Sequence, residues 1–326
     1  MRDFRYWLGE HKGTLLALAV FILMFAIYTG NHTAGFTPNV VNTAANKGVL
    51  LALVAMAQTM VVLTAGIDLS IGMIFVLANC LASTIVVGTP LQTGLGVAGV
   101  LLVGAACGAL NGVIVIYGRL QPIVTTLATG AIFYGISLFL RPVPGGDVNS
   151  DLADALTTKL PGGIPASLVV LAFVVLLIWV PFRRSLLGRA VYAIGSSEPA
   201  AYMSGVPIDR AKLLAYVLAG LLASCGGLML TFITYSGEAS ATIGGSYTLN
   251  SIAAVVLGGV SLFGGSGSAI GAIFGAFVLR TIGDLLFVFD FDPLWQPLFQ
   301  GVILLAAVTL GSFRLLRIKN RLDLFG

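Results

Sequence analysis

The sequence predicts an all-α protein that crosses a membrane about ten times, and three observations carry that prediction. Of the 326 residues, 58% are hydrophobic and only 9% are charged. The mean hydropathy is +1.01, a value that soluble domains of this length do not reach. The third observation is a series of apolar runs, each near the roughly 20 residues that a tilted transmembrane helix needs.

These runs extend over the whole chain, so residues 1–326 are interpreted as one transmembrane domain. Basic residues precede the first run and no small-residue cleavage site follows it, so we expect a retained span rather than a signal peptide. An even number of crossings brings both termini to the same side. The runs cover approximately residues 14–29, 48–65, 71–88, 94–117, 123–140, 166–182, 213–235, 249–263, 267–289 and 294–311.

The placement of basic residues predicts the orientation. They gather near the amino terminus, at Arg119, in the loop 183–212 and in the tail 314–321. Because cytoplasmic loops are enriched in Lys and Arg, both termini and the 183–212 loop are predicted to be cytoplasmic. The net charge of +4 is therefore explained by the membrane topology and does not indicate a nucleic-acid partner. The stretch 141–165 is then external. It either binds an extracytoplasmic partner or is a loop that contacts only water.

The middle of the 183–212 loop predicts a short helix on the cytoplasmic membrane surface. Ser197 can cap it, Glu198 and Pro199 suit a first turn, and Gly205 can end it. A helix this short is marginal in water and needs a partner. The pattern of Glu198, Ala200, Ala201 and Gly205 resembles the coupling helix of ABC importer permeases; an interfacial amphipathic helix without a partner is the alternative.

We therefore expect this segment to dock in a groove of a separate ATPase subunit. The residues assigned to the docking contact are Glu198, Pro199, Ala200, Ala201, Tyr202, Ser204 and Gly205.

The motif Gly66-Ile67-Asp68-Leu69-Ser70-Ile71-Gly72 interrupts apolar sequence on both sides and predicts a broken helix. An ionisable side chain between two spans must cap a helix, pair with another group or meet water. We expect Asp68 to cap a helix that begins at Leu69 and also to border the translocation pathway. Other polar residues of the spans are pathway candidates or interhelical hydrogen-bonding groups. The complete candidate set is Gln58, Thr64, Asp68, Ser70, Asn79, Asn111 and Asn250.

Two further patterns concern helix packing. Rows of glycine at a spacing of four residues, Gly104-Gly108-Gly112 and Gly267-Gly271-Gly275, predict close helix contacts, and an internal duplication is the alternative interpretation. Arg280 and Asp284 lie four residues apart and are expected to pair with each other, with an ion or proton relay as the alternative.

Several stretches together resemble the permeases of monosaccharide ABC importers, the ribose-type group. The G-I-D-L-S-I-G motif at 66–72 is the most specific of them, and the resemblance continues in the expected order through 108–112, 120–127, 187–195 and 256–265. It therefore covers nearly the whole chain. It implies a multi-pass protein of the bacterial inner membrane that pairs with a second permease subunit, receives solute from an extracytoplasmic substrate-binding protein, and is driven by two ATPase domains.

The sequence has no G-x-x-x-x-G-K-[ST] motif, so ATP and Mg²⁺ are expected on partner subunits and no cofactor on this chain. No enzymatic triad is predicted. His11, His32 and the three cysteines lack metal-ligand spacing, so no metal site is predicted either. The expected function is import of a small polar solute, most simply a monosaccharide, by alternating access. The alternatives are a nucleoside or other small-metabolite ABC permease and, from a different class, an ion-coupled secondary transporter.

Overall fold

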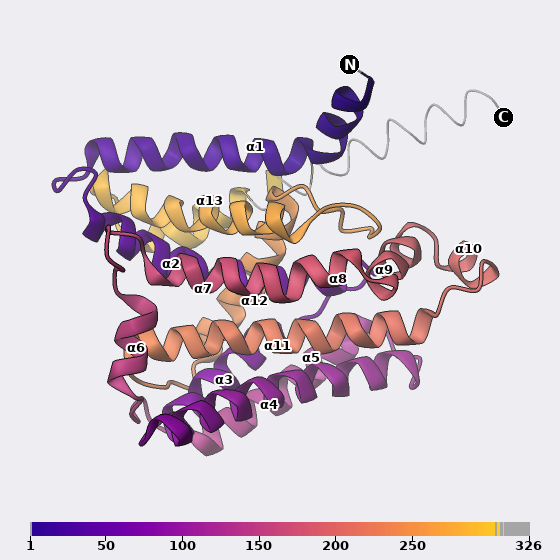
Figure 1. Cartoon of the computed structure of the whole chain (residues 1–326), viewed down its shortest axis with the longest axis horizontal. Helices are drawn as coiled ribbons and strands as arrows, with labels where there is room; N and C mark the ends of the chain where they lie inside the picture. Colours follow the sequence, from indigo (N-terminus) through magenta and orange to yellow (C-terminus); the bar gives the residue numbers. More distant parts are fainter. Residues whose placement is uncertain (1, 304, 307–308, 310–326) are drawn as a thin grey trace.

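The computed structural model describes residues 2–303, 305–306 and 309, and the described chain is all-helical apart from two isolated β-bridges. The long helices lie side by side in a bundle (Figure 1). The helices are α1 (Arg2–Asn31), α2 (Pro38–Val62), α3 (Ile71–Ile85), α4 (Pro90–Ile116), α5 (Pro122–Leu140), α6 (Ser150–Thr157), α7 (Ala166–Val174), α8 (Val180–Arg184), α9 (Leu186–Ser196), α10 (Glu198–Met203), α11 (Ile208–Thr234), α12 (Ala241–Leu257) and α13 (Ala269–Val288). Two short elements are the π-helix η1 (Val175–Trp179) and the 3₁₀-helix η2 (Pro293–Trp295), and residues 296–303 after η2 are also helical.

Seven helical segments of the described chain are long and apolar enough to cross a membrane, and α3 and α12 are shorter apolar helices. Nine of the predicted spans coincide with these elements. The predicted span 294–311 is only partly described, and the basic tail 314–321 lies outside the described residues. The clearest difference is α2, which begins at Pro38 instead of residue 48, because Thr37 caps the helix and Pro38 suits its first turn.

The span that includes α7, η1 and α8 is continuous although it contains a proline. Pro181 lies in the first turn of α8, directly after the π-helical turn Val175–Trp179. Because proline has no N–H and its ring crowds the preceding turn, a local change in helical pitch is needed to accommodate it. The π turn supplies that change without ending the span.

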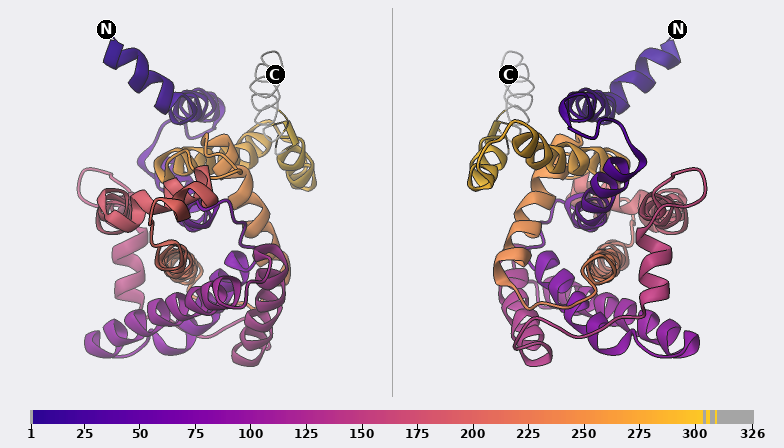
Figure 2. Two further views of the ribbon diagram at one scale, coloured as in Figure 1. Left: turned by 90° about the vertical axis from the view of Figure 1, so that its right-hand side faces the viewer. Right: turned by 90° about the vertical axis from the view of Figure 1, so that its left-hand side faces the viewer.

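α2 and α11 form the centre of the bundle. The most apolar 18-residue stretch of α2 is 89% buried within the chain, whereas the corresponding stretch of α1 is only 17% buried. Helices α3, α12 and α13 pack around α2, and α4 packs on α11. In the end-on views α1 lies at one edge of the bundle and α4 and α5 at the opposite edge (Figure 2).

Glycines set the close approach between helices. A Cβ atom placed on Gly108 would lie 2.1 Å from the carbonyl oxygen of Tyr216, and one on Gly220 would lie 2.1 Å from that of Gly104. The predicted row on α4 is therefore confirmed as a packing surface, with α11 as its partner. The second row is only partly correct: Gly271 and Gly275 pack against α12 from within α13, but Gly267 precedes that helix and has a left-handed φ of +115°.

The two ends of the bundle differ. α10 protrudes at one end, and the amino-terminal part of α1 lies at that same end, where a Cβ on Gly13 would be 2.5 Å from the Gly259 Cα (Figure 1). α6 lies at the opposite end. There Tyr235 donates a hydrogen bond to Asp154 of α6, and this bond holds the pKa of Tyr235 above its usual value.

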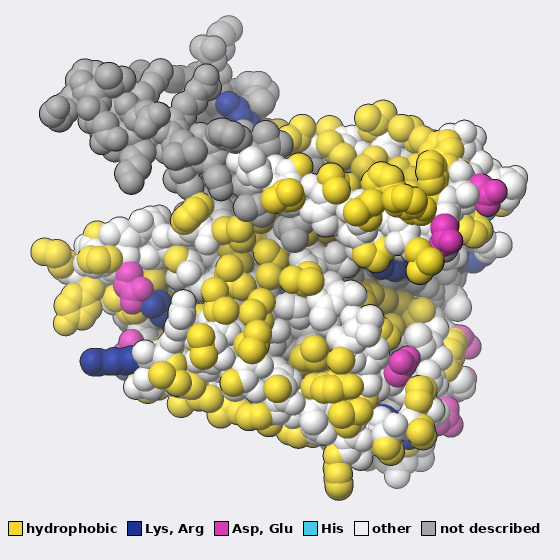
Figure 3. Space-filling model, turned by 180° about the vertical axis from the view of Figure 1, so that it is seen from behind, with side chains coloured by type: hydrophobic (Ala, Val, Ile, Leu, Met, Phe, Trp, Pro, Cys, Tyr) yellow, Lys and Arg dark blue, Asp and Glu magenta, His cyan; other side chains and the backbone are white. Residues whose placement is uncertain are grey.

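The surface suits a membrane. Exposed side chains on α4 and α5 are largely Leu, Ile, Val and Phe. From behind, charged side chains lie mostly toward the two ends of the molecule, with a yellow and white band between them (Figure 3). An apolar surface of this extent is stable next to lipid and not in water.

Candidate functional site

The short helix α10 forms where the sequence predicts it. The Ser197 side chain accepts a hydrogen bond from the Ala200 N–H at 3.4 Å, and Pro199 lies in the first turn. Gly205 follows the helix with a φ of +73°, a conformation that favours glycine. Only Ala201 of this segment is buried, at 5% exposure, whereas Tyr202 is 76% exposed. The helix thus presents nearly all of its surface outward.

Contacts within the loop hold α10 in place. Glu198 accepts a hydrogen bond from the Lys212 ammonium at 2.7 Å, which joins the start of α10 to the start of α11. The Val206 N–H donates to the Ala201 carbonyl at 3.1 Å and closes the helix end.

The preceding helix, α9, is fastened to the segment before α13. The Tyr192 hydroxyl donates a hydrogen bond to the Gly267 carbonyl at 2.8 Å, and the Arg183 guanidinium lies 4.2 Å from the centre of the Tyr192 ring. A cation over an aromatic face is attractive, so α8 and α9 are held together on this side. Only Ser197 separates the end of α9 from the start of α10, so the two helices are joined without an intervening loop.

The end of α9 contacts the backbone that follows α2. A Cβ on Gly195 would lie 2.0 Å from the Leu63 carbonyl oxygen, and that oxygen accepts a hydrogen bond from the Gly265 N–H at 3.1 Å. A Cβ on Gly264 would lie 2.7 Å from the Ala65 nitrogen. We call these three backbone segments, 63–65, 192–195 and 264–267, the junction. It places α9, which leads into α10, in direct contact with the chain that leads to Asp68.

The segment 63–70 is a non-helical connection between α2 and α3, which confirms the predicted helix break. Asp68 is completely buried. Its Oδ1 accepts hydrogen bonds from the Ser70 N–H at 2.8 Å and from the Ser70 hydroxyl at 2.6 Å. The prediction that a helix begins at Leu69 with Asp68 as its cap is wrong in detail, because α3 begins at Ile71 and Asp68 stabilises a local turn before it.

Side chains from other helices complete the hydrogen bonding of this turn. Asn111 of α4 donates to the Ser70 hydroxyl at 2.7 Å and to Asp68 Oδ2 at 3.5 Å. The Thr126 hydroxyl of α5 accepts from the Leu69 N–H at 2.9 Å, and the Thr248 hydroxyl of α12 accepts from the Gly72 N–H at 3.1 Å. Three of the predicted site residues, Asp68, Ser70 and Asn111, therefore form one buried network.

Asn79 lies apart from that network, in the C-terminal half of α3. Its side-chain amide donates to the Thr231 hydroxyl at 2.9 Å and to the Ser236 carbonyl at 3.1 Å, and its oxygen accepts from the Glu238 N–H at 2.8 Å. These bonds satisfy the amide and fix the non-helical connection between α11 and α12. Asn79 is an interhelical hydrogen-bonding group in this conformation.

The remaining predicted residues are distributed along the bundle. Gln58 is completely buried in α2 and neither of its polar atoms has a hydrogen-bond partner. Thr64 donates to the Val61 carbonyl at 2.7 Å in the segment after α2. Asn250 of α12 is half-buried. The structure thus brings Asp68, Ser70 and Asn111 together and leaves the other four outside their network.

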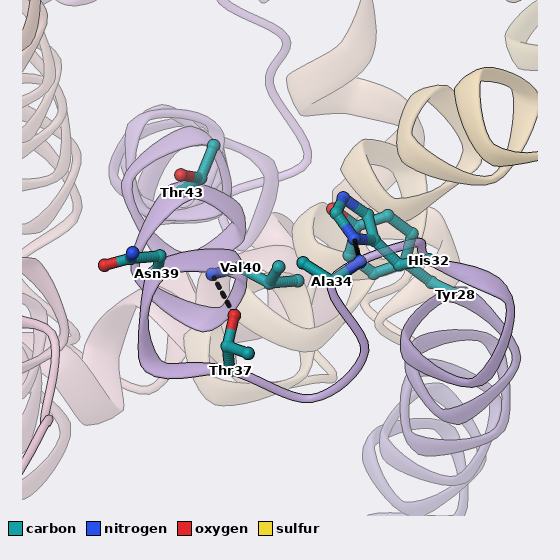
Figure 4. A pocket seen from close by; sticks show the side chains of 7 residues that line it. All are labelled: Tyr28, His32, Ala34, Thr37, Asn39, Val40 and Thr43. Atoms are coloured by element: carbon teal, nitrogen blue, oxygen red, sulfur yellow. Dashed lines mark hydrogen bonds between the residues drawn. The ribbon is translucent and has the colours of Figure 1, made fainter.

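A cavity of about 410 Å³ lies between the end of α1 and the start of α2 (Figure 4). Tyr28, His32, Thr37 and Asn39 are among the residues that line it. It contains none of the predicted pathway residues. Within the described residues, no group of three or more His, Cys, Asp or Glu side chains could hold a metal ion.

The predicted pair of Arg280 with Asp284 is wrong. Asp284 accepts a hydrogen bond from the Lys47 ammonium of α2 at 3.0 Å, and the Arg280 Nε has no partner among the described residues. The spacing of four residues permits a pair on one helix, but Lys47 approaches Asp284 from a neighbouring helix that contacts α13 extensively. Sequence analysis also missed the junction; Gly195, Gly264 and Gly265 lie in motifs that it noted, but their mutual contact requires the fold.

Comparison with known proteins is consistent with a transport subunit. Residues 40–308 match the family model described as a branched-chain amino acid transport system permease component. The chain is 35% identical to the ribose import permease protein RbsC of Escherichia coli K12 over 310 residues, 94% of each chain. It is 35% identical to RbsC of Bacillus subtilis over 303 residues, 90% of each.

The fructose import permease protein FrcC of Rhizobium meliloti is 31% identical over 307 residues, which cover 92% of this chain and 84% of that protein. No solved structure matches the chain. The chain therefore belongs to this family of ABC importer permease components, as an inner-membrane transport subunit and not an enzyme.

Proposed function

We propose that the protein imports a monosaccharide across the bacterial inner membrane as the permease subunit of a binding-protein-dependent ABC transporter. The observation that carries the proposal is the exposed helix α10, which directly follows α9, the helix whose end packs against the backbone that leads to Asp68. The substrates named for its relatives, ribose and fructose, favour a monosaccharide as cargo. The description of the family also names branched-chain amino acids, so leucine is the competing cargo to test.

The proposed topology has ten spans with both termini, the 183–212 loop and α10 in the cytoplasm. Support comes from the positive-inside distribution and from the position of the amino-terminal part of α1 at the α10 end of the bundle. The whole chain then acts as one transmembrane domain. α6 and the stretch 141–165 face outward, where a substrate-binding protein delivers solute.

In the proposed mechanism, two partner ATPase domains bind ATP with Mg²⁺ and move α10 when they close. The residues that make this contact are those assigned from the sequence: Glu198, Pro199, Ala200, Ala201, Tyr202, Ser204 and Gly205. The displacement passes through α9 and the junction to the segment 63–70 and shifts α3 relative to α4 and α12. A second permease subunit forms the other wall of the pathway. Alternating access follows because two packed arrangements of these helices exchange.

The proposal is tested with the purified permease in proteoliposomes, with and without its ATPase and binding-protein partners. ATP-dependent uptake of radiolabelled ribose or fructose is expected only in the complete assembly, with leucine as the competing substrate. Uptake by the permease alone, driven by an ion gradient, would overturn the ABC mechanism and favour a secondary transporter.

A double variant tests the docking role of α10. Glu198→Arg with Gly205→Leu removes the ion pair with Lys212 and places a side chain where φ is +73°. We expect normal membrane insertion but loss of the solute-stimulated ATPase activity and at least about a tenfold loss of uptake, equivalent to roughly 1.4 kcal/mol of coupling. Unchanged coupled ATPase activity in this variant would show that the partners dock elsewhere.

A further inference from the structure

A group of polar side chains on α12, α13 and the helical residues after η2 lacks hydrogen-bond partners within the described chain. The Nε of Arg280 and the Nε2 of Gln300 are buried and have no acceptor. Asn250 and Tyr247 of α12 are half-buried and likewise form no side-chain hydrogen bond among the described residues. By contrast, Thr248 and Ser251 of the same helix are buried and bonded.

Backbone contacts place this group at one level of the bundle. A Cβ on Gly271 would lie 2.1 Å from the Gly258 carbonyl oxygen and one on Gly275 would lie 2.1 Å from that of Ala254. α12 and α13 are therefore antiparallel, and the same register brings Arg280 level with Asn250. A Cβ on Gly283 would lie 2.9 Å from the Gln296 side chain, and Gln300 lies one turn beyond Gln296 on the same helical face.

The charge of Arg280 is not neutralised by a carboxylate of the described chain. The nearest candidate on its own helix, Asp284, is engaged by Lys47 at 3.0 Å. The Tyr247 ring on the neighbouring helix α12 stacks on Phe75 with 4.4 Å between ring centres. The group therefore combines fixed donors, a hydroxyl and an aromatic face.

This group lies at a depth where contact between its polar side chains and lipid hydrocarbon would cost free energy. Arg280 is 11 residues into α13, about 17 Å along a helix of 20 residues. Unsatisfied polar groups in the bilayer core cost several kcal/mol each. The exposed face of α12 also carries Thr242 and Ser246, and Gly245 has open space around it, whereas α4 and α5 expose mainly large apolar side chains. Figure 2 shows α12 in orange at the side of the bundle between α13 and α3.

We propose that Asn250, Arg280 and Gln300, with Tyr247, form the contact site for a neutral polyhydroxylated solute inside the permease. This inference rests on the proposed function and names residues for its pathway. Sugar hydroxyls both donate and accept, so they match a set that combines guanidinium and amide donors with amide and phenol oxygens. Transporter sites lie characteristically near the membrane midplane, which is the level of these residues. The buried and largely bonded Asp68 network holds α3 in place beside this site.

The test uses the complete importer in proteoliposomes with Asn250→Leu, Arg280→Met and Gln300→Leu, each of which retains most of the side-chain volume. Uptake is measured for a transported monosaccharide and for deoxy analogues that lack single hydroxyl groups. The wild type is expected to discriminate against at least one analogue by about tenfold or more, because a site that hydrogen-bonds a hydroxyl rejects a solute without it. At least one variant is expected to lose that discrimination.

Asn31→Leu, at the exposed end of α1, is the matched control and should leave uptake and discrimination unchanged. The basal ATPase activity of the assembly should likewise be unaffected by Asn31→Leu. Unchanged discrimination in all three site variants would overturn the site. Loss of uptake together with dissociation of the permease pair would also overturn it, since the residues would then hold a second copy. Absence of monosaccharide uptake by the wild type would instead refute the proposed function.

Discussion

Lys47 and Asp284 illustrate how an ionisable pair is accommodated between transmembrane helices. The two groups are 3.0 Å apart and join α2 to α13, with side-chain exposures of 46% and 10%. Removal of one member of a buried pair leaves an uncompensated charge, which costs about 3–5 kcal/mol when both groups are fully buried. The half-exposed Lys47 reduces that cost here.

We expect Asp284→Asn to destabilise the protein by roughly 1–3 kcal/mol, below the range for a fully buried pair. Lys47→Met should have a similar effect, and the double variant should lose less than the sum of the two, because neither charge is then left alone. Thermal unfolding in detergent of the four proteins measures the coupling. Strict additivity would show that the ion pair contributes no stability. If Asp284 instead paired with Arg280, Lys47→Met would have no effect.

At the scale of the element, the glycines of α4 and α11 determine how closely two spans pack. The backbone of Gly108 faces the Tyr216 carbonyl with no space for a side chain. Such contacts maximise dispersion attraction between helices that gain little from the hydrophobic effect within lipid. Small residues at this interface are therefore a requirement of the packing geometry.

Gly108→Ala is expected to destabilise the bundle by about 1–3 kcal/mol, because overpacking forces the two helices apart. Gly135→Ala in α5 is the matched control: a Cβ there meets nothing within 4 Å, so helix propensity should make the change neutral or slightly stabilising. Thermal unfolding in detergent provides the comparison. Equal melting temperatures for Gly108→Ala and the wild type would mean that the α4 and α11 contact is looser than described.

The junction joins elements that are far apart in sequence, and the proposed mechanism requires it to transmit movement between them. Gly195, Leu63 and Gly265 meet backbone to backbone, so a displacement of α9 has no flexible side chain to absorb it. The predicted consequence is specific to coupling. A Cβ on Gly195 would meet the Leu63 carbonyl oxygen at 2.0 Å, so Gly195→Ala should push the segments of the junction apart. In the complex that still assembles, we expect solute uptake per ATP hydrolysed to fall by about tenfold, if roughly 1.4 kcal/mol of coupling is lost.

The control for the junction variant is again Gly135→Ala in α5, where a Cβ meets nothing within 4 Å. Measurement of uptake and ATP hydrolysis on the same proteoliposomes separates coupling from folding. A parallel fall in uptake and hydrolysis with loss of assembly would indicate a structural role for Gly195 and none in transmission.

At the scale of the whole molecule, the arrangement is a mechanical connection between an exposed helix and a buried turn. α10 lies outside the bundle, the junction lies at its base, and the segment 63–70 continues from the junction to the Asp68 network. The chain belongs to a family of transport permease components, and in the proposed mechanism the free energy for transport enters through contacts at α10.

Much of this architecture follows from local sequence. Runs of apolar residues determine which segments can span a membrane, because backbone hydrogen bonds in lipid must be satisfied within each helix. Ser197, Pro199 and Gly205 determine α10 for the same local reason: caps and turns depend on neighbouring residues. The motif around Asp68 likewise predicts the break between α2 and α3.

Only the tertiary structure decided which polar groups meet. Asp284 has Arg280 four residues away, yet it pairs with Lys47, 237 positions distant in sequence. Among the polar candidates, Asn79 is satisfied by α11 and its following segment, whereas Asn250 is half-buried and forms no side-chain hydrogen bond within the described residues. The physical reason is that helix formation depends on contacts within one turn, whereas the partner of a side chain depends on which helix faces are brought together.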